Sequence, residues 1–70
     1  MIADLRKLKT LSKKYADDLD LSALLNSAAD EVRFIQQIDE GGTPAHQTRA
    51  RAIERLNGFE SMIVQRGIAL

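Results

Sequence analysis

Hydrophobic residues in the first part of the chain recur every three or four positions, which is the spacing of one face of an α-helix. This first group consists of Leu5, Leu8, Leu11, Tyr15 and Leu19. The pattern predicts a helix over residues 3–17. No glycine or proline interrupts the first forty residues, so the end of this helix has to be found from the hydrophobic pattern itself.

A second group of hydrophobic residues starts two positions out of step with the first. It consists of Leu21, Leu25, Ala28, Val32, Ile35 and Ile38. A slip of two residues corresponds to a rotation of about 200°, which moves the hydrophobic stripe to the opposite side of a helix. We therefore predict a second helix over 21–40, with the Asp20 carboxylate as its N-cap. A single long helix with partners on two faces is the alternative.

Glycine and proline mark the transition to a third helix. Gly41-Gly42 predicts the end of the second helix, and Thr43-Pro44 is typical of an N-cap followed by the first helical residue. The next hydrophobic stripe keeps a helical spacing across Gly58, so we predict one helix over 44–68 that tolerates this glycine at about 1 kcal/mol. The stripe consists of Ala45, Ala52, Ile53, Leu56, Phe59, Ile63 and Leu70.

These elements predict an all-α fold in a single small helical domain over residues 1–70. We expect the second and third helices to form an antiparallel hairpin, with the N-terminal helix packed across it or against a neighbouring chain. So small a domain usually needs an additional source of stability. The chain has no cysteine, so we expect a homo-oligomer. The residues predicted for an oligomer or partner interface are Leu8, Leu11, Leu24, Phe34, Phe59, Met62 and Ile63.

The charged residues cancel in number but are segregated along the chain. The net charge is +4 over residues 1–14, −6 over 15–44 and +2 over 45–70. We expect the acidic second helix to find its basic partners in the other helices rather than within itself. The candidates are the lysines of the first helix and Arg49, Arg51 and Arg55 of the third. Such surface pairs select orientation and partner more than they stabilise.

The sequence predicts a protein that is not an enzyme and holds no metal or cofactor. His46 is the only histidine and there is no cysteine, so a nucleophile and its base would have to be built around one residue in the first turn of a helix. The balanced charge disfavours a dedicated nucleic-acid binder. The longest uncharged run in the first forty residues, 21–29, is far below the roughly 20 residues that span a bilayer. We expect a cytoplasmic protein without a membrane partner.

The segment from Pro44 onward resembles the helical hairpin of phage-encoded cyclic-oligonucleotide sponges, which suppress nucleotide-signalling immunity. Pro44, the run Ala52-Ile53, the pair Arg55-Leu56 and the block Gly67-Ile68-Ala69 carry this resemblance. It implies a non-catalytic oligomer that holds a cyclic oligonucleotide in pockets between subunits. Such a site needs cations and an aromatic face. The candidate ligand-binding residues are Tyr15, Lys13, Lys14, Arg51 and Arg55.

A second resemblance rests on Gly41-Gly42, Pro44 and the run Ala50-Arg51-Ala52-Ile53-Glu54. These residues are similar to the small hairpin co-chaperones of type III secretion needles. That resemblance implies a helical hairpin that docks on a helical-repeat protein.

Three classes of function follow from the sequence. The first is a small helical interaction protein, an adaptor, inhibitor or co-chaperone, that binds itself and another protein through its helical faces. The alternative is a phage anti-defence sponge that sequesters cyclic oligonucleotides. A small DNA-binding regulator is third.

Overall fold

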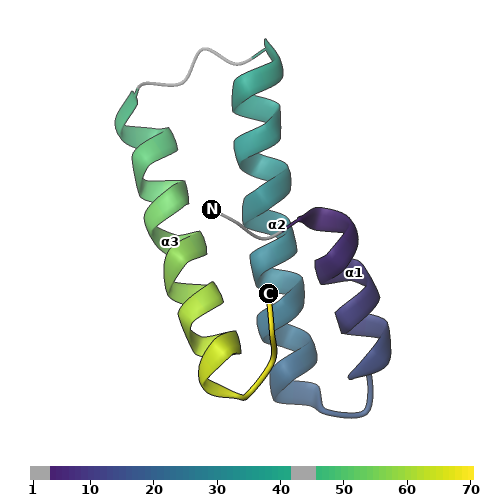
Figure 1. Cartoon of the computed structure of the whole chain (residues 1–70). Helices are drawn as coiled ribbons and strands as arrows, with labels where there is room; N and C mark the ends of the chain where they lie inside the picture. Colours follow the sequence, from purple (N-terminus) through teal and green to yellow (C-terminus); the bar gives the residue numbers. More distant parts are fainter. Residues whose placement is uncertain (1–3, 42–45) are drawn as a thin grey trace.

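The protein folds into three helices joined by short connections, as a computed structural model that describes residues 4–41 and 46–70 shows (Figure 1). Helix α1 spans Leu5–Lys14, α2 spans Leu19–Gly41 and α3 spans His46–Gln65. The described residues contain no strand, so the all-α prediction is confirmed. Thr43 and Pro44, predicted to begin the third helix, lie outside the described residues, as does Gly42.

The predicted break between the first two helices is confirmed, but its details differ from the prediction. Helix α1 ends at Lys14 rather than at residue 17. Helix α2 begins two residues early, and Asp18 caps it instead of Asp20, since the Asp18 carboxylate accepts a hydrogen bond from the Leu21 amide at 3.1 Å. Asp20 lies inside the first turn. The hydrophobic restart at Leu21 did not mark the helix start because Leu19, although helical, is 80% exposed.

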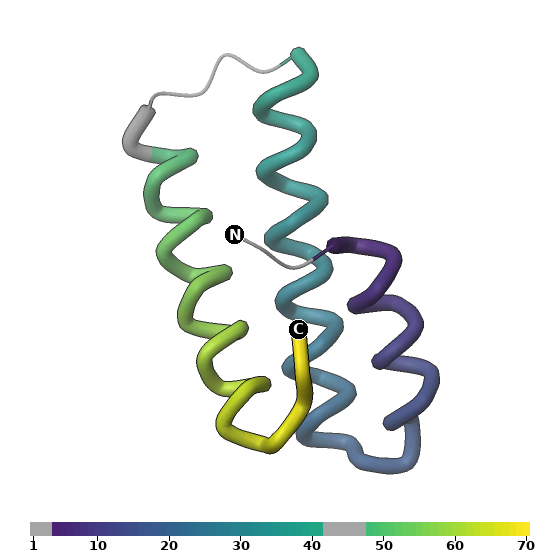
Figure 2. The backbone as a smooth tube through the Cα atoms, in the orientation of Figure 1, coloured from purple at the N-terminus to yellow at the C-terminus, as the bar shows by residue number. Residues whose placement is uncertain are grey.

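Helix α3 continues through Gly58, as predicted, but it ends at Gln65 rather than at residue 68. Gly67 adopts φ +85°, a left-handed conformation that glycine tolerates far better than other residues. The chain therefore turns back, and the C-terminal tail of residues 66–70 runs in front of α2 in Figure 2. Ile68 of this tail is buried in the core.

Helix α2 is the centre of the molecule because both other helices pack against it. α1 packs on α2 but not on α3, whereas α3 lies along α2 and runs in the opposite direction (Figure 1). The largest fully buried side chains, Leu8, Leu25, Leu56 and Ile63, come from all three helices. No buried side-chain polar atom among the described residues lacks a hydrogen-bond partner. The burial of Leu8 places α1 within the core of the single chain.

The helices differ in length, and this divides the molecule into two ends. At 1.5 Å per residue, the 10-residue α1 is about 15 Å long and the 23-residue α2 about 34 Å. α1 is therefore too short to cover the whole of α2. We call the covered part, α1 with residues 19–31 of α2 and 56–70, the closed end. We call the remainder, residues 32–41 of α2 and 46–55 of α3, the open end.

Candidate functional site

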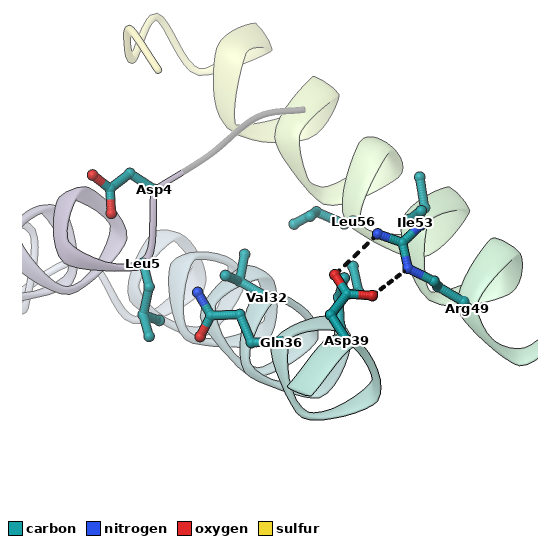
Figure 3. Close-up of a pocket in the computed structure, with 9 residues that line it drawn as sticks. Asp4, Leu5, Val32, Gln36, Asp39, Arg49, Ile53 and Leu56 are labelled. Carbon is teal, nitrogen blue, oxygen red and sulfur yellow. Dashed lines mark hydrogen bonds and ion pairs between the residues drawn. The ribbon is translucent and has the colours of Figure 1, made fainter. Parts of the chain in front are cut away.

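The clearest concave feature of the described residues is a groove where the open end meets the start of α1 (Figure 3). It has a volume of about 310 Å³ and opens to solvent along one side. α1, α2 and α3 all contribute to it. The lining residues are Asp4, Leu5, Val32, Ile35, Gln36, Asp39, Arg49, Ile53 and Leu56.

The floor of the groove is apolar. Val32 and Ile35 of α2 and Leu56 of α3 are buried, while Leu5 and Ile53 are partly exposed at its sides. These residues follow the helical spacing that also builds the core. The groove therefore continues the core surface past the start of α1. Apolar surface of this kind favours binding of an apolar side chain over water.

An ion pair between Asp39 and Arg49 ties the two helices of the open end together at the groove edge (Figure 3). Arg49 donates from Nε to Oδ1 of Asp39 at 2.7 Å and from Nη2 to Oδ2 at 3.1 Å. These hydrogen bonds from Arg49 lower the pKa of Asp39, and the same carboxylate raises the pKa of Arg49. Both side chains remain about half exposed, so the pair orients the helices more than it stabilises them.

Polar groups occupy the rim of the groove near the start of α1. The Asp4 carboxylate caps α1 by accepting a hydrogen bond from the Arg6 amide at 2.9 Å. Gln36 is exposed on α2, and its side chain lies beside that of Val32 in the view of Figure 3. With Arg49 bound to Asp39, the rim carries one carboxylate more than it has cations.

A second bidentate pair joins α2 and α3 outside the groove. Arg55 donates from Nε to Oε2 of Glu31 at 3.0 Å and from Nη2 to Oε1 at 3.1 Å. The hydrogen bonds to Glu31 raise the pKa of Arg55. The expectation that third-helix arginines pair with second-helix carboxylates is thus confirmed for Arg49 and Arg55.

The structure differs from the other two expectations about charge pairing, which concern pairs within α2 and pairs with the lysines of α1. Asp30 pairs with Arg33 three residues along its own helix, at 3.2 Å, so the expectation that all partners lie in other helices was wrong. It overlooked the i,i+3 spacing of these two residues. The ion pairs that the described residues show involve no lysine of α1.

The five predicted ligand-binding residues fall into two separate groups. Lys13, Lys14 and Tyr15 lie together at the end of α1, where the Lys14 ammonium is 5.4 Å from the centre of the Tyr15 ring. Arg51 is exposed on α3, and Arg55 is held by Glu31. Because α1 does not pack on α3, a single chain does not bring the two groups into one site.

The seven predicted interface residues divide by burial. Leu8 and Ile63 are fully buried within the chain, and Leu11, Leu24 and Phe59 are partly buried against its core. Phe34 and Met62 are exposed, at 37% and 53%. Leu8 and Ile63 therefore belong to the core of the single chain, whereas the other five residues keep some accessible surface.

The sequence reasoning missed the groove as a site. Its residues were assigned to helical stripes or to charge pairing, as was the case for Val32 and Arg49. One signal was present, because the first predicted helix is shorter than the second and leaves part of it uncovered.

The described residues contain no cluster of three or more His, Cys, Asp or Glu side chains that could hold a metal ion. Within the same part of the chain, no helix has the length and apolar character to cross a bilayer. No protein-family model, curated protein or solved structure matches the chain.

Proposed function

We propose that the protein is a non-enzymatic interaction protein whose groove binds an amphipathic helix of a protein partner. The observation that carries this proposal is the unequal length of α1 and α2, which leaves an apolar groove between α2 and α3. A partner helix at this position would cover the open end as α1 covers the closed end. Helix-in-groove docking uses apolar anchors at three- and four-residue spacing.

The dimensions and charge of the groove define the partner further. A volume of about 310 Å³ is at the lower end of the range for small-ligand pockets, so it accommodates anchoring side chains while the partner backbone lies outside. The rim carboxylate that Arg49 does not pair, Asp4, favours a basic flank on the partner helix. The proposed partner is therefore a leucine- or isoleucine-bearing helix with lysine or arginine beside its anchors.

Two neighbouring glutamines provide a matched test of this proposal. Gln36 lines the groove, whereas Gln37 is also exposed but lies about 100° further around the helix. A photo-reactive side chain at position 36 should cross-link one specific polypeptide in an extract of the source cells, and the same group at 37 should not.

A pair of tryptophan variants then tests whether the groove itself binds. Gln36→Trp should fill the groove and abolish co-purification of the cross-linked polypeptide, while Gln37→Trp should retain it. Circular dichroism should show both variants to be folded, because neither change removes a core side chain. Equal retention by the two variants would refute the groove as the docking site.

A further inference from the structure

We propose that a second copy of this chain docks on the side of α2 and α3 that faces away from the groove. We call this surface the opposite face; it consists of Leu24, Glu31 and Phe34 of α2 with Arg55, Phe59 and Met62 of α3. The inference concerns a different surface from the proposed function and does not depend on it.

Helix periodicity places these residues together. On α2 they are separated by seven and three residues, and on α3 by four and three, which are the spacings of one helix face. The Glu31–Arg55 pair joins the two helices on this face, and none of the six residues lines the groove. The start of α1 borders the groove, and in Figure 1 the C-terminal tail crosses in front of α2. With α1 and the tail in place, Phe34 and Met62 of the opposite face remain exposed.

The opposite face exposes apolar surface on both sides of a central charged pair. Phe34 is 37% and Met62 53% exposed, and Leu24 and Phe59 are partly buried. In the antiparallel arrangement of the two helices, Phe34 lies on one side of the Glu31–Arg55 pair and Met62 on the other. An apolar surface with a polar pair at its centre resembles the core of a dimer interface in which a buried charge fixes the register.

The charges on this face are complementary to those of a second copy. The α2 edge carries Asp30 and Glu31, and the α3 edge carries Arg51 and Arg55. A two-fold axis parallel to the helices would place α2 of one copy over α3 of the other, so that acidic and basic edges meet. An axis across the helices would instead bring the two acidic α2 helices together, which costs free energy.

This arrangement also satisfies the packing rules of helix bundles. With the axis parallel to the helices, each helix has antiparallel neighbours, as in a four-helix bundle with up-and-down order. Such a closed, isologous pairing is the commonest form of homo-oligomer. At the centre, the Glu31–Arg55 pairs of the two copies would lie at the same height and form a ring of alternating charges.

The accessible area suits a dimer of this size. The Cα atoms of the molecule extend over 37 × 19 × 17 Å, so one long face is comparable to the roughly 800 Å² that each partner buries in a standard interface. Glu31 is already only 18% exposed in the single chain, which limits the cost of removing it from water on association.

The mass of the full-length protein in solution is the first test. Loaded at about 100 µM, where a dimer of micromolar affinity is almost fully formed, the wild type should elute with a light-scattering mass twice its 7.8 kDa chain mass. Phe34→Glu and Met62→Glu should each give the monomer mass with an unchanged circular dichroism spectrum.

Val64→Glu is the matched control for these variants. Val64 is 55% exposed, close to the value for Met62, but two residues further along α3 it points about 200° away. This variant should remain dimeric. A monomeric wild type, or a Phe34→Glu variant that stays dimeric, would overturn the proposal, as would dissociation caused equally by Val64→Glu.

Introduced cysteines test the direction of the axis, since the chain has none of its own. When Leu24→Cys and Met62→Cys proteins are mixed and oxidised, the disulfide between positions 24 and 62 of different chains should dominate. Failure of the 24–62 disulfide to form would overturn the proposed arrangement, because an axis across the helices would place these two positions at different heights along the dimer.

Discussion

The closed and open ends of this molecule are built from the same two helices but complete their cores differently. At the closed end, α1 and the C-terminal tail cover α2, and the fully buried Leu8, Leu25 and Ile63 lie there. At the open end, α2 and α3 pack on each other with only the start of α1 beside them among the described residues, and the Asp39–Arg49 ion pair bridges the two helices at the edge of a groove.

Under the proposed function, this difference would separate stability from binding within a chain of 70 residues. Burial of large side chains stabilises roughly in proportion to the apolar area removed from water, and most of that burial is at the closed end. The open end retains apolar surface that a partner helix would cover. Substitutions at the closed end should therefore alter the free energy of unfolding most, and substitutions at the open end should alter binding.

The largest expected difference is between the effects of truncating one apolar side chain at each end. Leu25→Ala, at a fully buried position, should lower the free energy of unfolding by about 2–5 kcal/mol. Ile53→Ala, at a partly exposed position beside the groove, should lower it by about 1 kcal/mol. Urea denaturation of both variants measures the two values. Equal losses would show that the open end is as important to stability as the closed end.

Two glycines give a smaller pair of effects with opposite signs. Gly67 has φ +85° in the turn that directs the tail over the closed end, so Gly67→Ala should cost about 1 kcal/mol. Gly58 lies within α3, and a methyl group added at its Cα would meet no neighbouring atom within 4 Å. Gly58→Ala should therefore stabilise by about 0.5–1 kcal/mol. Thermal melts of the two variants that shift in the same direction would contradict this assignment of conformations.

Acid should weaken the open end through its ion pair. The pKa of Asp39 is lowered in the folded protein by its hydrogen bonds from Arg49, so the unfolded state binds the proton more readily. The stabilising contribution is complete above the ordinary pKa of aspartate, about 3.9, and is lost as the pH falls through the lowered folded value.

Thermal melts between neutral pH and pH 3 compare two variants for this effect. Asp39→Asn should make the midpoint less dependent on pH than in the wild type. Glu40→Gln is the control, because the described structure shows no ion pair for that neighbouring carboxylate; it should leave the slope closer to the wild-type value. Identical slopes for Asp39→Asn and wild type would contradict the role of the ion pair.

The smallest expected effect is the absence of a change. Cyclic di- and trinucleotides should leave the melting midpoint unaltered, because Arg55 is bound to Glu31 and the lysines of α1 lie apart from α3. A rise of the midpoint at saturating ligand would favour the sponge, since a ligand that binds the folded state stabilises it.

The helices were predictable because each depends on local spacing. The two-residue slip located the break before α2, and the unbroken stripe predicted continuity across Gly58. The residues at which the helices begin and end were harder to predict. Leu19 fits the first stripe but belongs to α2, and Leu70 keeps the phase of α3 although the turn at Gly67 has already ended that helix. In both cases hydrophobic spacing persists where the backbone has changed direction.

The groove was not predictable from spacing alone. Its existence depends on which part of α2 remains uncovered after α1 has packed, and that is a property of three elements together. The ion pairs differ in the same way, since some depend on local spacing and others on how the helices pack. The Asp30–Arg33 pair could have been found from its spacing, whereas the choice of Glu31 for Arg55 and Asp39 for Arg49 required the register between helices.

Hydrogen exchange along α2 tests the division into two ends most directly, because one continuous helix passes through both. We predict that the amides of Ala28 and Ala29, buried at the closed end, exchange at a rate close to that of global unfolding. The amides of Gln36 and Ile38 at the open end should exchange much faster by local opening. Equal protection along the whole of α2 would contradict the account, since the open end would then be as completely packed as the closed end.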